Sequence, residues 1–336
     1  MSKSWLICLL FLLSACSGQQ PIEFKGRAMG GSYDVKIAAL PVGVTENELG
    51  AQIKQQVDAI EHAGSTYLGN SELNQINRAK LQQPVKVSPL AFELIQFAVS
   101  MAKESNGAYE PTIGPLVDAW GFGPQIQPEH WLADETIAEL KKRVGYQFVE
   151  FDSSNSAIKR TADVELNVNG VMQGFAADKV ATLLERNGCQ DYLVNILGEV
   201  KARGHKADQQ QWNIAIETPN YDNDLPHAVE KLVSLDGKGM ATSGNYRNYY
   251  ELDGKRISHI INPFTGRPIE NRVASVSVVD ASAARADGLT KPLMIMGEEE
   301  GVAWAKQKGI SALFIIRDGN GFKEVVTGDF AKFVTN

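Results

Sequence analysis

The residues with the clearest capacity for chemistry lie between Ala241 and Thr290. This part of the chain contains Ser243, then a Ser-His-Ile stretch centred on His259, then an Ala-Asp-Gly stretch centred on Asp287. It gathers hydroxyl groups, an imidazole and a carboxylate, which are groups that enzymes use for proton transfer and for binding hard cations. This combination is hard to explain as scaffold, so it predicts a functional site.

Three earlier segments are also hard to explain as scaffold. In Met29-Gly30-Gly31-Ser32-Tyr33, the paired glycines allow the backbone to approach a ligand closely. The stretch Glu110–Gly123 mixes rigid turn residues with Trp120 and Phe122, which suit stacking on a planar ring, although a rigid loop with core aromatics would have the same composition. The stretch Asn167–Asp178 is typical of a loop that enters a helix, where free backbone N–H groups and the helix dipole suit a phosphate.

In this order and spacing, the four segments resemble the FAD:protein FMN transferase family, also called ApbE. The resemblance covers about residues 24 to 325. It also takes in Ser65-Thr66-Tyr67, Ser71-Glu72-Leu73 with Asn77, and Asn195-Ile196-Leu197-Gly198-Glu199. Members of this family bind FAD with its pyrophosphate against a magnesium ion and pass the FMN half to a threonine or serine of a target protein, releasing AMP. The resemblance therefore implies an ApbE-like fold, FAD as substrate and Mg²⁺ as cofactor.

The resemblance also implies roles for single residues. Asp287 matches the metal-binding aspartate of the family, and the main-chain carbonyl of Met172 matches a second ligand. His259 matches the histidine of the family's Ser-His-Ile motif, and an imidazole suits a general base that takes the proton of the acceptor hydroxyl. Matching positions imply an FAD pocket formed by Met29, Tyr67, Glu110, Asp178 and Ser243.

Two departures from the family pattern concern charge. Many members carry lysine where this chain has Gln173, and the threonine ligand expected four residues after Asp287 is replaced by Lys291. Thr290 stands one residue out of register, and Pro292 follows Lys291. Three interpretations stay open: Thr290 binds the metal because the proline distorts the turn, Lys291 supplies charge in place of a ligand, or the metal affinity is weakened.

Other functions are compatible with parts of this pattern. An FAD pyrophosphatase would use the same site with water as acceptor, giving FMN and AMP. A flavin-binding lipoprotein without catalysis is favoured by Lys291 and Gln173, whereas the retained Asp287 and His259 argue against it. A generic solute-binding lipoprotein would explain an anchor but not the ordered motifs.

The N-terminus is typical of a bacterial lipoprotein. Lys3 precedes the apolar run Trp5–Leu13, which is too short to span a bilayer but suits the core of a signal peptide. Leu13-Ser14-Ala15-Cys16 resembles a lipobox, in which the new N-terminal Cys16 is acylated. The expected organisation is a signal peptide over 1–15, a lipid-anchored tether over 16–23 and a flavin transferase domain over 24–336.

This anchor predicts a location on the periplasmic side of a bacterial membrane, and Ser17 after the cysteine suggests the outer one. By resemblance, the targets would be membrane-associated flavoprotein subunits, such as those of an ion-pumping NADH:quinone reductase or a related electron-transfer complex. The formal net charge of -7 argues against a nucleic-acid partner. Cys189 would be the one cysteine of the mature domain besides Cys16, so we expect no intramolecular disulfide there.

The elements that must position these residues form an α+β pattern with mixed sheets, in which helices alternate with strands. Thr45 and Ser88 are typical helix N-caps, and they predict helices that end near Glu61 and Gly107. Two further helices, over 175–187 and near 299–309, are each predicted to precede a strand, at Tyr192–Ile196 and at 311–316. Further strands are predicted at Trp212–Ile216 and Ala274–Val279, and turn-rich stretches at Gly237–Gly244 and Asn262–Pro268.

Overall fold

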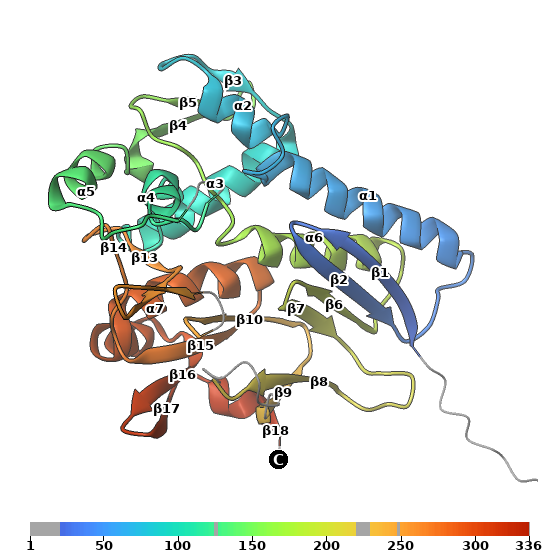
Figure 1. Cartoon of the computed structure of the whole chain (residues 1–336). Coiled ribbons are helices and arrows are strands. Elements are labelled where there is room, and N and C mark those ends of the chain that lie inside the picture. Colours follow the sequence, from blue (N-terminus) through green and yellow to red (C-terminus); the bar gives the residue numbers. More distant parts are fainter. Residues whose placement is uncertain (1–20, 124–126, 220–228, 247–248, 336) are drawn as a thin grey trace, which may run out of the picture.

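An eight-stranded sheet forms the centre of the molecule (Figure 1). The computed structural model describes residues 21–123, 127–219, 229–246 and 249–335. In sheet order, the strands are β1 (Ile22–Ala28), β2 (Gly31–Ile37), β6 (Tyr192–Ile196), β7 (Glu199–Arg203), β10 (Lys238–Gly244), β15 (Val273–Asp280), β16 (Ser311–Asp318) and β17 (Gly321–Thr327). Each neighbouring pair is antiparallel.

The predicted α+β class is confirmed, but the prediction of mixed sheets is wrong. Helix α7 (Ala283–Lys308) shows the physical reason. Its backbone leaves helical geometry at Gly297, where φ is 78°. The helix thereby returns the chain to the end of the sheet that it left, and Ser311 pairs with Val279 in an antiparallel register. A helix between two neighbouring strands therefore does not impose parallel pairing when the helix is broken.

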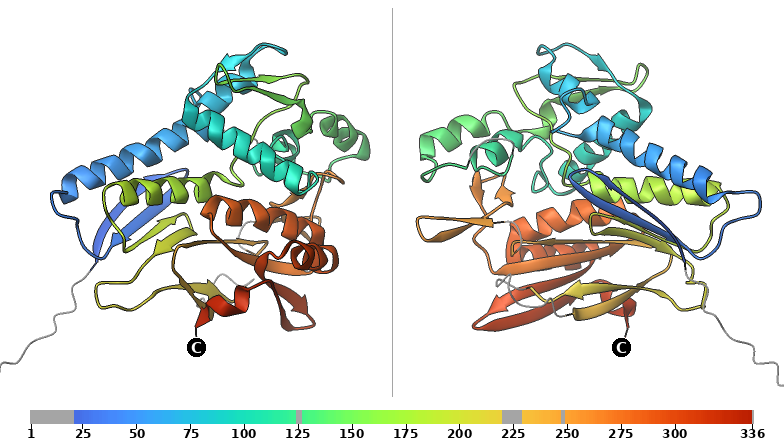
Figure 2. Two further views of the ribbon diagram at one scale, coloured as in Figure 1. Left: turned by 180° about the vertical axis from the view of Figure 1, so that it is seen from behind. Right: turned by 45° about the vertical axis from the view of Figure 1, so that its right-hand side comes forward.

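Helices cover one face of this sheet (Figures 1 and 2). α6 (Met172–Arg186) packs on β6 and β7, and α7 packs on β10 and β15. α1 (Glu46–Gly64) packs on α6, and α3 (Pro89–Glu104) contacts both α1 and α7. The predicted caps are confirmed, since the side chains of Thr45 and Ser88 accept hydrogen bonds from the first turns of α1 and α3. A core of apolar side chains fills the space between these helices and the sheet.

The opposite face of the sheet is covered by a three-stranded sheet (Figure 2). Its strands are β8 (Trp212–Glu217), β9 (Val229–Leu235) and β18 (Val334–Thr335), and Trp212 and Phe330 lie buried in a second apolar cluster.

The remaining helical elements are α2 (Glu72–Arg78), α4 (Gly114–Ala119), α5 (Asp134–Lys141) and short 3-10 turns at Tyr146–Phe148 and Phe330–Phe333. The remaining strands form a small sheet of β3 (Val85–Lys86), β5 (Ala157–Arg160) and β4 (Val149–Asp152), and the hairpins β11 (Tyr249–Leu252) with β12 (Lys255–Ser258) and β13 (Ile261–Asn262) with β14 (Arg267–Pro268).

Strand β10 corrects the prediction that Gly237–Gly244 is a turn-rich stretch. The segment is an inner strand of the main sheet, paired with β7 and β15. Its small residues have a packing role, because a Cβ on Gly239 would lie 2.5 Å from the backbone of Ala283 at the start of α7. A composition typical of turns thus reflects the close approach of a helix to a strand.

Several calls on the N-terminus fall outside the described residues. These are the signal peptide over 1–15, the lipidation site Cys16 and most of the predicted tether. Strand β1 begins at Ile22, two residues before the predicted domain boundary at residue 24. Within the part of the chain that the structure describes, no helix combines the length and apolar character needed to cross a bilayer. Cys189 is buried and its thiol is free.

Candidate active site

A cavity of about 440 Å³ is lined by segments between Thr66 and Ile295. Its wall is formed by the segments after α1 and α3, by α4 and the loop after it, by the loop that enters α6, by β10, by the segment before β13, and by α7. Five predicted site residues lie on this wall, and they are Tyr67, Glu110, Ser243, His259 and Lys291. The fold thus brings together residues that are far apart in the sequence.

One side of the cavity is apolar. Ile113, Val117 and Ile295 contribute aliphatic surface, and the ring of Phe122 lies 6.2 Å from that of His259 at an interplanar angle of 68°. Of the two aromatic residues predicted to stack on a planar ring, only Phe122 lines the cavity. Trp120 is fully buried, and its Nε1–H donates to the carbonyl of Gly266 at 2.8 Å.

Hydrogen bonds to its backbone hold the loop that enters α6 in place. The side chain of Asn77 both donates to the carbonyl of Leu166 and accepts from its N–H, at 2.9 and 2.8 Å. The N–H of Asn167 donates to the carbonyl of Pro111 at 2.6 Å. A Cβ on Gly170 would lie 2.8 Å from the ring of Tyr109, so the loop passes directly over that side chain. These contacts fix the cavity wall where Asn167, Asn169, Gly170 and Gln173 face the interior.

Asp287 lies below this wall and is completely buried. Its Oδ2 accepts a hydrogen bond of 3.1 Å from the N–H of Gly174, in the first turn of α6, where backbone N–H groups have no partner within the helix. Its Oδ1 forms an ion pair with the ammonium of Lys291, one turn further along α7. Burial raises the pKa of Asp287, and the positive charge of Lys291 and the Gly174 N–H act in the opposite direction.

Thr290 and Met172, two further predicted metal ligands, do not line the cavity. The hydroxyl of Thr290 is buried, donates to the carbonyl of Asp287 and lies 2.7 Å from Oγ of Ser243. Met172 is the first residue of α6, and its buried side chain packs beside Gly64 in the core. Among the described residues, no group of three or more His, Cys, Asp or Glu side chains could hold a metal ion.

Glu110 uses its carboxylate to organise the cavity wall. Oε1 accepts hydrogen bonds from the N–H and hydroxyl of Thr112, and Oε2 accepts one from the N–H of Tyr146 at 3.2 Å. Burial raises the pKa of Glu110 above its usual range. Tyr67 differs in being 68% exposed, which places it at the rim.

Two buried polar atoms near Asp287, the hydroxyl oxygen of Tyr109 and Oε2 of Glu199, received no role in the sequence-based predictions. Neither the hydroxyl of Tyr109 nor Oε2 of Glu199 has a hydrogen-bond partner among the described residues. Burial, followed by the charge of Asp287, raises the pKa of both groups well above their usual ranges. The available signals were the position of Tyr109 directly before Glu110, and that of Glu199 at the end of a matching family block.

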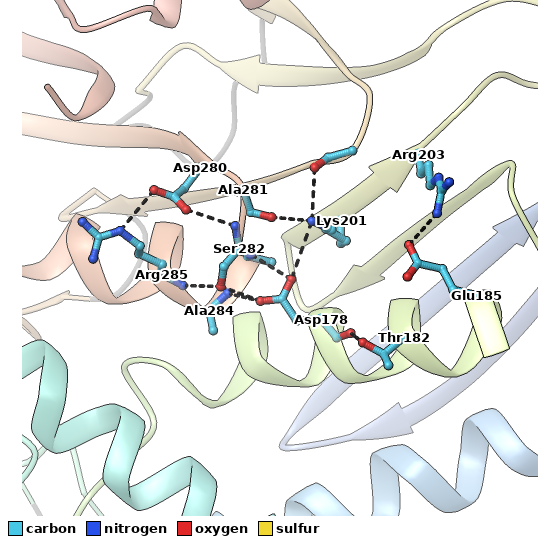
Figure 3. Close-up of polar contacts among 12 residues, drawn as sticks. Asp178, Thr182, Glu185, Lys201, Arg203, Asp280, Ala281, Ser282, Ala284 and Arg285 are labelled. Atoms are coloured by element: carbon cyan, nitrogen blue, oxygen red, sulfur yellow. Dashed lines mark hydrogen bonds and ion pairs between the residues drawn. The ribbon is translucent and has the colours of Figure 1, made fainter.

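Met29 and Asp178 do not line the cavity. Met29 has a positive φ of 53° in the turn between β1 and β2, and its N–H donates to Glu61. The carboxylate of Asp178, although on α6, accepts hydrogen bonds of 2.6 to 3.0 Å from the Ser282 hydroxyl and from the first two N–H groups of α7 (Figure 3). Asp178 therefore joins the starts of two helices.

Comparisons with known proteins agree with this architecture. A sequence model of the ApbE family matches residues 29–314. An FAD:protein FMN transferase of Vibrio cholerae is 35% identical over 99% of both chains. The crystal structure of the Pseudomonas stutzeri flavinyl transferase ApbE in its apo form superposes with a TM-score of 0.84, at 35% identity, over 94% of this chain and 96% of that one. For the flavin transferase ApbE of Vibrio cholerae, the TM-score is 0.85 at 33% identity, over 94% and 99% of the two chains. Because the family model covers most of the chain and the relatives match it over nearly its full length with the same fold, the chain belongs to the ApbE family.

Proposed function

We propose that this protein transfers FMN from FAD to a threonine or serine hydroxyl of a target flavoprotein and releases AMP. The observation that carries the proposal is the placement of His259 and Lys291 on one cavity wall, in a chain that matches FMN transferases over nearly its full length. An imidazole supplies a proton acceptor, and an ammonium supplies positive charge for a diphosphate.

The reaction is a substitution at phosphorus. The acceptor oxygen bonds to the phosphorus of the FMN half as the bond from that phosphorus to the bridging oxygen breaks, and AMP leaves with that oxygen. The proton of the acceptor hydroxyl moves to His259, which lies on the wall as a general base must. The apolar side of the cavity, with Phe122, suits the planar flavin ring and restricts water. Tyr67 at the rim and Glu110 in the wall would contact FAD directly, whereas Met29 and Asp178 do not line the cavity and would support the fold around it.

The family resemblance implies Mg²⁺ as a cofactor, so we asked whether the side chains around Asp287 could bind this ion. Mg²⁺ prefers octahedral coordination by oxygen, with one or two carboxylates. Asp287 already shares Oδ1 with an ammonium, and the ammonium of Lys291 has no lone pair to offer a metal. The hydroxyl of Thr290 is engaged by Ser243 and the Asp287 carbonyl. With an ammonium on Asp287 in place of an oxygen ligand, Asp287, Thr290 and Lys291 do not fit the magnesium site that the resemblance implies, so we assign no step of the transfer to a bound Mg²⁺.

The proposed setting of the reaction is the periplasmic side of a bacterial membrane, with the protein anchored through lipid on Cys16. Membrane-associated flavoprotein subunits, such as those of an ion-pumping NADH:quinone reductase, would then lie within reach as acceptors. In a bacterial host, the full chain should fractionate with membranes, and Cys16→Ser should lose the lipid and leave the membrane fraction. Lipid attachment that persists in Cys16→Ser would contradict the anchor.

The function is tested by incubating the purified protein with FAD and a candidate acceptor subunit, followed by tandem mass spectrometry of the acceptor. The expected result is FMN attached through phosphate to one threonine or serine, with AMP in solution. Formation of FMN and AMP without an adduct would instead identify hydrolysis. Bound but intact FAD would show a flavin-binding protein without catalysis.

A further inference from the structure

Lys291 is the one lysine or arginine among the described residues that line the cavity. The other formally charged residues on this wall are Glu110, Asp118 and Glu165, all carboxylic acids. A diphosphate is negatively charged, and its cleavage requires positive charge aimed at the oxygens where negative charge develops. Among the lining residues that the structure describes, Lys291 and His259 are the side chains that can supply it.

The position of this ammonium is fixed by its surroundings. Asp287 is completely buried, so the ion pair between the two side chains holds the ammonium at one point of the cavity floor. The ammonium also donates to the carbonyl of Asp287 at 3.2 Å. A Cβ on Gly170 would lie 3.6 Å from Cε of Lys291, so the side chain runs beneath the loop that enters α6. The Lys291 side chain keeps 24% of its surface exposed and lines the cavity.

The two positions at which the sequence departs from the family pattern lie on the same cavity wall. Gln173, where many members carry lysine, and Lys291, where a threonine ligand is expected, line the same cavity. Relative to that pattern, this chain lacks a positive side chain at one point of the wall and carries one at another. The gained charge lies on Asp287, the carboxylate that a metal ion would need.

We propose that the ammonium of Lys291, held by Asp287, replaces a divalent cation as the group that binds the FAD diphosphate. The proposal rests on the proposed function and deepens it. During transfer, the ammonium would keep its proton and stabilise the phosphate of the departing AMP, while the acceptor oxygen bonds to phosphorus and its proton passes to His259. No oxidation or reduction occurs, and no metal ion takes part.

The test is a titration of FAD binding by flavin fluorescence, made with the purified protein in excess EDTA and again in Mg²⁺. Wild-type affinity should be the same in both conditions, within about twofold, because a preformed ammonium needs no metal. Lys291→Met should bind FAD about tenfold or more weakly in both conditions, since it loses a hydrogen bond to a charged group. Lys291→Thr should bind weakly in EDTA and regain affinity in Mg²⁺, because it restores an oxygen ligand beside Asp287.

Matched variants separate charge from folding. Lys54→Met removes the lysine of an exposed Lys–Asp pair with the same spacing of four residues, and it should leave FAD binding unchanged. Lys291→Met leaves a buried carboxylate unpaired, so a second variant, Asp287→Asn with Lys291→Met, keeps the shape of the pair without its charges. Lys291→Arg should retain FAD binding in EDTA. Thermal unfolding of each variant identifies any loss of affinity caused by unfolding.

The proposal is overturned if the wild-type protein binds FAD only in Mg²⁺, or if the folded double variant binds FAD in EDTA as tightly as wild type. In either case, an FMN adduct formed in Mg²⁺ would still support the proposed transferase function. Absence of an adduct in both EDTA and Mg²⁺, despite bound FAD, would refute the transferase itself. The two failures are therefore distinguishable.

Discussion

Replacing Asp178 by alanine should destabilise the fold without affecting FAD binding. Its carboxylate accepts hydrogen bonds from the Ser282 hydroxyl and from the N–H groups of Ala283 and Ala284, at 2.6, 2.9 and 3.0 Å. In Asp178→Ala, the two N–H groups at the start of α7 lose their partner, as in the loss of a helix cap. A helix cap contributes about 0.5 to 2 kcal/mol, and hydrogen bonds to a charged group lie at the upper end of the scale.

Asp178 is 24% exposed, so water can partly replace the lost acceptor. We therefore expect the free energy of unfolding to fall by about 2 kcal/mol. Urea denaturation should show a lower midpoint with an unchanged slope. The control Asp58→Ala removes an exposed helical aspartate paired with Lys54, and it should change stability by less than about 0.5 kcal/mol.

The result that would refute this reasoning is the reverse pattern. If Asp178→Ala kept its stability but lost FAD affinity, Asp178 would contact the cofactor, as the family resemblance implies, rather than cap α7. A double-mutant cycle with Ser282→Ala refines the assignment, because residues in direct contact show non-additive changes. Additive effects would place the stabilising contact elsewhere.

Three further predictions concern the site and its supports. His259→Gln should lower the rate of FMN transfer by about 10² to 10⁴, with FAD affinity nearly unchanged, because it removes only the proton acceptor; single-turnover kinetics would contradict this if the rate stayed within a few fold of wild type. Burial raises the pKa of Glu110, so the native state binds more protons than the unfolded state above pH 4.5, and the stability of wild type relative to Glu110→Gln should decrease as pH rises through this window. Urea titrations at a series of pH values check this, and a relative stability that increases with pH would refute it. Gly174→Ala should cost about 1 to 3 kcal/mol of stability, because its Cβ would lie 2.4 Å from the carbonyl oxygen of Ala283, whereas Gly69→Ala, which meets no atom within 4 Å, should be nearly neutral in the same urea assay.

Local chemistry in the sequence predicted many elements correctly. The caps at Thr45 and Ser88 and the apolar run Tyr192–Ile196 each correspond to an element of the structure. These signals are local, because a cap bonds its own helix and an alternating strand buries its own face. The part of α7 before its break at Gly297 gave no such signal, because Gly288 and Pro292 lie within it and most of its residues are buried.

The sequence predicted which segments form the site, but not which side chains contact one another within it. The sequence brought His259 and Asp287 into one hypothesis through family motifs, yet it could not show that Asp287 is inaccessible and paired with Lys291. It also could not show that Asp178 faces α7, because that contact joins residues 104 positions apart. Such pairings depend on how α6 and α7 pack together, and the two helices approach closely where Gly174 meets Ala283.

The central claim is that this cavity transfers FMN to a hydroxyl group rather than to water. The most direct measurement is the ratio of AMP released to FMN covalently bound, determined on one reaction mixture of wild-type protein, FAD and an acceptor subunit. Transfer predicts equal amounts of the two products throughout the reaction and the loss of both in His259→Gln. AMP formed together with free FMN, with no covalent flavin on the acceptor, would contradict the account.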